Sequence, residues 1–181
     1  GYVTAITMCY FLVEGYHYTH SKDRYCRRLL ILAAISQIPF NLALGAFGLN
    51  IMFTLLICFA IIWVMENVSG STRRNLFAAG LTVLSVISDW GIFAAIFTII
   101  FERRRGNKDK YQTLLSFCYC TLVFGFFEYL NLAGNFGYIA AISHVIFEML
   151  PLVAAGLMIE FFYNGRKSDR NQIFNKWFFY V

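Results

Sequence analysis

The chain is organised around Glu14-Gly-Tyr-His-Tyr-Thr-His-Ser-Lys-Asp-Arg-Tyr-Cys-Arg-Arg28, a polar stretch flanked by two apolar runs. It places a carboxylate, two histidines and several cations at the edge of a hydrophobic layer. In a helix, Glu14, His17, His20 and Arg24 would share one face, because residues three and four positions apart are neighbours on a helix surface. Ionisable groups so close to hydrocarbon are costly, so this face is a candidate functional site. The alternative is that these residues only anchor the chain at a membrane surface.

The composition predicts an integral membrane protein. Hydrophobic residues make up 59% of the 181 residues and charged residues only 14%, whereas a soluble domain carries about 25% charged residues. No polar block is long enough to fold separately, so we expect one all-α domain, residues 1–181, built as a polytopic helical bundle. The net charge of +5 is better explained by basic loops facing the cytoplasm than by nucleic-acid binding.

The sequence does not indicate a disulfide framework or a metal site. The five cysteines lie in or beside apolar runs, without a CxxC pair or Cys/His ligand spacing, so we interpret them as packing thiols. Glu14-x-x-His17 resembles half of a di-iron Glu-x-x-His motif, but a second copy is absent. We therefore expect no bound metal.

The basic residues divide the chain into apolar segments. The apolar runs are 1–16, 29–44, 51–65, 76–101, 111–130 and 136–163. All fifteen Lys and Arg fall in four polar stretches, 17–28, 66–75, 102–110 and 164–176, and the connections 45–50 and 131–135 carry no charge. If every basic stretch faces the cytoplasm, the run 76–101 must enter and leave the membrane on the same side.

This requirement predicts a broken or re-entrant helix pair in the run 76–101, with Ser88-Asp89-Trp90-Gly91 at its tip. Each arm would have about twelve residues, too few to cross a bilayer alone. Irregular backbone at that depth is tolerated only where protein or a water-filled cavity surrounds it. The alternative is one ordinary span that violates the charge rule locally.

Three acids lie deep enough in the apolar runs to indicate function: Glu14, Asp89 and Glu148. Glu128 and Glu160 lie near the ends of spans and are interpreted as surface anchors. His144 and Glu148 are four residues apart, so the carboxylate can orient the imidazole as a general base. The alternative for this pair is an interhelical hydrogen bond without chemistry.

Several blocks follow one another in a family-specific order and cover nearly the whole chain. They are Phe11-Leu-Val-Glu-Gly-Tyr16, Thr19, Tyr25, Arg28-Leu29, Ala34-Ile-Ser-Gln-Ile-Pro-Phe-Asn-Leu42, Asn50-Ile-Met-Phe-Thr-Leu55, Asp89-Trp-Gly-Ile92, Tyr163-Asn-Gly165 and Lys176-Trp-Phe-Phe-Tyr180. Together these blocks resemble the TraX family of membrane proteins. The resemblance implies a bacterial inner-membrane N-acetyltransferase that acetylates the N-terminus of conjugative pilin subunits with cytoplasmic acetyl-CoA.

The resemblance also implies helices beyond both ends of this chain, one with an Asp-His pair and one with a Tyr-Pro-x-His segment. If the catalytic histidine belongs to the first of these, His17, His20 and His144 have supporting roles. A peptide N-acetyltransferase is the leading hypothesis. The alternatives are an O-acetyltransferase of a glycan or small molecule, and a transporter or assembly factor without chemistry.

The resulting hypothesis places acetyl-CoA in a polar cleft open to the cytoplasm. A histidine would deprotonate the acceptor, and Asp89 or Glu14 would orient its imidazole. Asp89 is the strongest candidate, and Asp89→Asn is expected to abolish transfer without unfolding the protein. The residues expected to bind the cofactor are Arg103, Arg104, Arg105, Asn164, Arg166 and Lys167, whose cations could hold its phosphates, although such cations can also serve topology alone.

Overall fold

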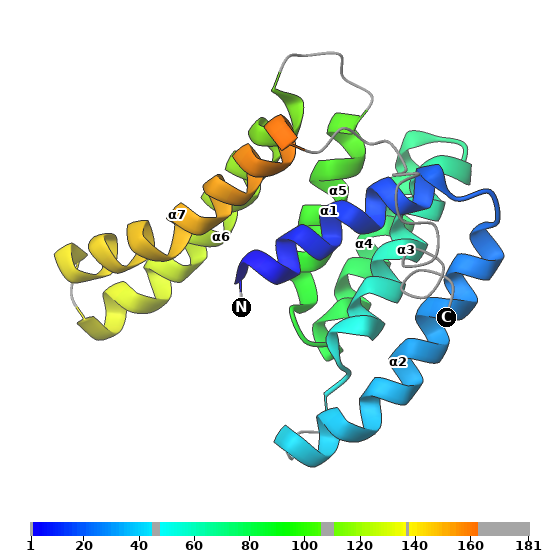
Figure 1. Ribbon diagram of the computed structural model, residues 1–181, viewed down its shortest axis with the longest axis horizontal. Helices are drawn as coiled ribbons and strands as arrows, with labels where there is room; N and C mark the ends of the chain where they lie inside the picture. Colours follow the sequence, from blue (N-terminus) through cyan, green and yellow to red (C-terminus); the bar gives the residue numbers. More distant parts are fainter. Residues whose placement is uncertain (1, 45–47, 106–110, 137, 163–181) are drawn as a thin grey trace.

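The computed structural model describes residues 2–44, 48–105, 111–136 and 138–162, and these residues form helices only (Figure 1). The predicted all-α class is therefore confirmed. The helices are α1 (Tyr2–Tyr18), α2 (Lys22–Leu44), α3 (Ile51–Asn67), α4 (Ser71–Leu84), α5 (Gly91–Arg105), α6 (Gln112–Phe136) and α7 (Tyr138–Phe162), with a short 3₁₀ turn, η1 (Ser85–Ile87), between α4 and α5.

Helix α1 crosses α5 and holds the two halves of the structure together. On one side α6 and α7 form a long antiparallel hairpin, and on the other side α2, α3 and α4 lie side by side (Figure 1). The core between them is aromatic and aliphatic, with Ile6, Tyr16, Phe97 and Phe117 fully buried. Burial of such side chains contributes roughly 1.5–3 kcal/mol each, so this core fixes how α1 crosses α5.

The helix pair predicted around Asp89 is present. Helix α4 ends at Leu84 and α5 begins at Gly91, after a turn in which Trp90 has φ +64° and Gly91 has φ +21°. A Cβ atom on Gly91 would lie 3.2 Å from the carbonyl oxygen of Ser85, so the close approach of the two arms favours glycine here.

The tip of this hairpin is held against the residues that precede α3. The backbone N–H of Asp89 donates to the carbonyl of Leu49 over 2.8 Å, and that of Leu49 donates to Ile87 over 3.3 Å. The Thr54 hydroxyl also donates to the carbonyl of Asp89. The tip therefore lies level with the start of α3, and the hairpin runs alongside that helix.

The contacts of Asn50 explain why the blocks 34–42 and 50–55 carry amides inside apolar sequence. Its Oδ1 caps α3 by accepting from the N–H of Met52 over 3.0 Å, and its Nδ2 donates to Ser36 over 2.9 Å. Its own N–H donates to Gln37 over 3.0 Å. These bonds satisfy polar groups at the α2–α3 connection that would otherwise be costly in an apolar setting.

The polar ends of the helices meet at one end of the molecule, which we call the charged end. Contacts there join α1, α3 and α5 through Tyr16, His17, Glu66, Glu102 and Arg105. Because α4 begins at this end and α5 ends at it, the segment 76–101 leaves and returns to the same end of the molecule.

Two of the described helices are long and apolar enough to cross a membrane, 112–134 within α6 and the whole of α7. Helix α3 is apolar but shorter, with 17 residues. The described residues therefore contain two candidate membrane spans, and the polytopic bundle stays a prediction. The uncharged turn predicted at 131–135 is wrong, because α6 continues through these residues to Phe136.

Candidate functional site

The charged end brings His17 together with Glu102. Nε2 of His17 lies 2.9 Å from Oε2 and 3.1 Å from Oε1 of Glu102. Both side chains are mostly buried, with 18% and 14% of their surfaces exposed. When Nε2 carries the proton and donates it to the carboxylate, Nδ1 is left as the proton-accepting nitrogen. This tautomer suits a general base.

A second ion pair lies next to the first. Nε of Arg105 is 3.2 Å from Oε1 of Glu14. Glu14 and His17 are one turn apart on α1, and Glu102 and Arg105 are one turn apart on α5. The two helices are thus joined by two polar contacts at the point where they cross.

The three consecutive arginines do not form one phosphate-binding patch. The guanidinium of Arg104 lies 4.5 Å from the ring centre of Tyr119, and Arg105 pairs with Glu14. Arg103 faces a groove between α4 and α5 on another side. Neighbouring residues in a helix point about 100° apart, which explains why the three side chains diverge.

A third polar contact links α1, the start of α2 and the end of α3. The Tyr16 hydroxyl donates to Oε2 of Glu66 over 2.7 Å, and the Lys22 ammonium donates to the same oxygen. The Lys22 ammonium also lies 4.3 Å from the ring centre of Tyr16. The hydrogen bond from Lys22, together with that from Tyr16, holds the pKa of Glu66 below its ordinary value.

A small polar cavity lies beside the Glu14–Arg105 pair. It has a volume of about 40 Å³, and its lining residues are Tyr10, Val13, Glu14, Phe101, Arg105, Gln112, Thr113 and Ser116. Such a volume holds one or a few water molecules. A cavity of this size is too small to enclose a molecule as large as acetyl-CoA.

Asp89 lies far from this site, so of the two carboxylates expected to orient a histidine, Asp89 or Glu14, Asp89 does not meet His17. Asp89 precedes α5 at its first turn, and Glu102 lies in its last turn. At ~1.5 Å per residue, the helix from Gly91 to Glu102 is about 17 Å long. The side chain of Asp89 is exposed at the hairpin tip. The carboxylate that contacts His17 is Glu102.

The expected common face of Glu14, His17, His20 and Arg24 is also wrong. Helix α1 ends at Tyr18, so His20 lies in the connection and Arg24 on α2. The helix stops because Thr19 begins a polar connection after the last apolar residue of α1.

His144 and Glu148 form a separate pair on α7. Nδ1 of His144 lies 3.4 Å from Oε1 of Glu148, and the histidine side chain is 61% exposed. Oε2 of Glu148 is buried without a hydrogen-bond partner among the described residues. The pairing expected from the four-residue spacing is present, but no contact among the described residues joins it to His17. Asn164, Arg166 and Lys167 lie outside the described residues.

Glu160 is not a surface anchor. Its Oε2 accepts the N–H groups of Thr113 and Leu114 over 3.0 and 3.3 Å. A carboxylate from the last turns of α7 therefore caps the first turn of α6, where a helix has unpaired N–H groups and a positive dipole end.

Sequence reasoning missed Glu102, Glu66 and Lys22 as members of the site. Glu66 and Glu102 each lie where an apolar run meets a basic stretch, and Lys22 lies within the basic stretch 17–28, so all three were interpreted as parts of polar boundaries. The sequence feature that could have identified Glu66 and Glu102 is that each is the first acid after an apolar run. Their partners are 44 to 85 residues away and cannot be derived from local spacing.

The fold and the site together define an all-helical membrane protein with an ionisable cluster at one end of its helices. The chain belongs to the TraX protein family, which matches residues 5–179. It is 25% identical over 187 residues to the probable fimbrial assembly protein FimC, serogroup H1, of Dichelobacter nodosus. That similarity covers 94% of this chain and 72% of the relative. No solved structure is significantly similar.

Proposed function

We propose that the protein is a membrane N-acetyltransferase that moves an acetyl group from cytoplasmic acetyl-CoA to the amino terminus of a pilin-like peptide. Membership of the TraX family and the similarity to a fimbrial assembly protein support a role in making or modifying pilin subunits. The observation that carries the chemistry is the His17–Glu102 pair at the charged end.

His17 acts as the general base in this proposal. Nδ1 takes a proton from the acceptor amine while the amine nitrogen bonds to the thioester carbonyl carbon and the carbon–sulfur bond breaks, with CoA leaving as its thiolate. Glu102 accepts the Nε2–H hydrogen bond and stabilises the imidazolium that forms, as the carboxylate of a catalytic triad does. Such proton transfer contributes about 10²–10⁴-fold in rate.

The acetyl donor binds on the surface of the charged end, where its phosphates meet arginine side chains. Arg104 supports this position, because it lies in the last turn of α5 and no described carboxylate forms an ion pair with it. A guanidinium group without a carboxylate partner gains charge-assisted hydrogen bonds from phosphate oxygens. Arg105 is less available, since Glu14 already pairs with it.

The test measures CoA thiol release by the purified protein in detergent, with acetyl-CoA and a synthetic pilin amino-terminal peptide. We expect His17→Gln and Glu102→Gln each to lower turnover by about 10²-fold or more. Asp89→Asn is the matched control, a carboxylate-to-amide change at the other end of α5, and should leave turnover near wild type. Wild-type-like turnover in His17→Gln, or loss of turnover in Asp89→Asn alone, would overturn the assignment.

The second candidate is an assembly factor without chemistry, which the similarity to a probable fimbrial assembly protein favours. It predicts co-purification with pilin subunits and no acetyl-CoA consumption. A third possibility, O-acetylation of a glycan or small molecule, shares the donor and the base. Peptides with a free or a blocked amino terminus separate it from N-acetylation, because only the free amine accepts the group in the proposed reaction.

A further inference from the structure

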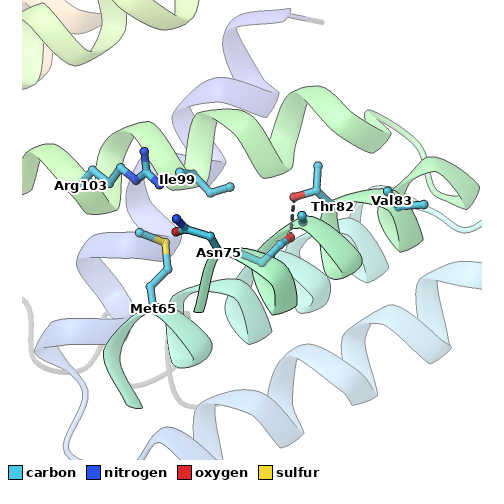
Figure 2. Close-up of a pocket in the computed structure, with 8 residues that line it drawn as sticks. Met65, Asn75, Thr82, Val83, Ile99 and Arg103 are labelled. Carbon is cyan, nitrogen blue, oxygen red and sulfur yellow. Dashed lines mark hydrogen bonds between the residues drawn. The ribbon is translucent and has the colours of Figure 1, made fainter. Parts of the chain in front are cut away.

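A groove opens on the outer side of the helix pair α4–α5, away from the His17–Glu102 pair. Its volume is about 360 Å³, within the size range of ligand sites in proteins. Its lining residues are Met65, Asn75, Ala78, Ala79, Thr82, Val83, Ile99 and Arg103. Figure 2 shows Arg103 and Asn75 at one end of the groove and Thr82 and Val83 at the other.

The two ends of the groove differ in chemistry. Beyond Asn75 the wall is apolar, and the Thr82 hydroxyl is engaged with the carbonyl of Ala78 over 2.8 Å (Figure 2). At the other end Arg103 is exposed, and no described carboxylate forms an ion pair with it. The groove therefore combines an apolar body with a cationic end.

The cationic end lies level with the charged end of the helices, since Arg103 is one residue from Glu102 and Asn75 belongs to the second turn of α4. In a membrane protein this is the level of the lipid headgroups, where Lys and Arg meet the phosphates. From Asn75 to Val83 the apolar wall follows α4 for about 12 Å toward the hairpin tip.

We propose that this groove binds one anionic phospholipid, with an acyl chain along α4 and α5 and the phosphate between Arg103 and Asn75. The side chains of Ala78 and Ala79 are small, which leaves room for a chain to lie against the helix. Arg103, which no described carboxylate pairs, selects an anionic headgroup over a zwitterionic one. The site is separate from the acetyl-transfer site and does not depend on that activity.

Lipid binding can be measured by native mass spectrometry of the detergent-purified protein, delipidated and then titrated with phosphatidylglycerol or with phosphatidylcholine of the same acyl chains. One exposed cation contributes about 1 kcal/mol toward an anionic membrane lipid, so we expect a preference for phosphatidylglycerol of about fivefold. Arg103→Gln should abolish this preference and leave phosphatidylcholine binding unchanged. Ala79→Phe should reduce the binding of both lipids, because the ring fills the groove.

The controls are Arg73→Gln, an exposed cation near the start of α4 that does not line the groove, and Leu84→Phe, an exposed residue of α4 outside it. Both should bind as the wild type does, and all variants should keep the wild-type melting temperature. The proposal would be overturned if the wild type retained the two lipids equally, or if Arg103→Gln kept the preference for phosphatidylglycerol. It would also be overturned if a co-purifying polypeptide protected the thiol of an Ala79→Cys variant from labelling.

Discussion

Nε2 of His17 lies 2.9 Å from Oε2 of Glu102, although the two residues are 85 positions apart in the chain. Glu102 is therefore a positioning residue in the proposed reaction, acting through the imidazole. We expect the double variant His17→Gln/Glu102→Gln to lose no more turnover than His17→Gln alone, because residues that act as a unit are strongly non-additive. The turnover of the wild type, the two single variants and the double variant gives the coupling energy between His17 and Glu102. Additive losses would mean that Glu102 acts elsewhere.

The contact of Lys22 and Tyr16 with Glu66 predicts a pH-dependent stability. The pKa of Glu66 is lowered in the folded protein, so its contribution is fully present above the unfolded pKa, about 4.3, and is lost as the pH falls through the folded pKa. Glu66→Gln should reduce the drop in melting temperature between pH 6 and pH 3. Melting curves of both proteins across that range test this prediction. An identical drop in the variant would contradict it.

Because Glu160 caps the start of α6, removing its carboxylate should destabilise the α6–α7 hairpin locally. Glu160→Ala leaves the N–H groups of Thr113 and Leu114 without an acceptor and should cost about 0.5–2 kcal/mol. Glu160→Gln should lose less, because its amide oxygen can still accept. Hydrogen exchange at residues 113–116 is the measurement, with Glu128→Ala as the control for removing a carboxylate. Unchanged exchange in Glu160→Ala would show that the cap has no energetic role.

The close packing of α6 against α7 at Gly156 can be tested by adding a methyl group there. A Cβ atom there would lie 2.7 Å from Cβ of Phe117, which is fully buried, so Gly156→Ala should destabilise the protein by about 1–3 kcal/mol. Gly134→Ala is the matched control, because nothing lies within 4 Å of its Cβ position. It should be neutral or stabilise α6 by up to about 1 kcal/mol. Equal melting temperatures for the two variants would contradict this packing.

The local sequence was sufficient for the helices and for the break near Asp89. Apolar run lengths and the positions of Lys and Arg are properties of short stretches, and together they required the segment 76–101 to return to the end it left. The same local reasoning placed a helix boundary at 131–135, where α6 continues. That stretch is uncharged and contains Gly134, but it includes no proline or second glycine to end the helix.

Local sequence patterns could not predict which side chains contact one another at the site. Which carboxylate meets His17 depends on the angle at which α1 crosses α5, and that angle is fixed by the packing of buried residues such as Phe97 and Phe117. The pattern of apolar and basic residues along the chain was enough to predict the helices and the α4–α5 hairpin. It was also enough to predict that the basic residues lie at one end of the helices. The packing of the helices determines that Glu102, and not Asp89, contacts the imidazole of His17. It also determines what Arg103, Arg104 and Arg105 each contact. Contacts between helices depend on how the helices cross, and no short stretch of sequence contains that information.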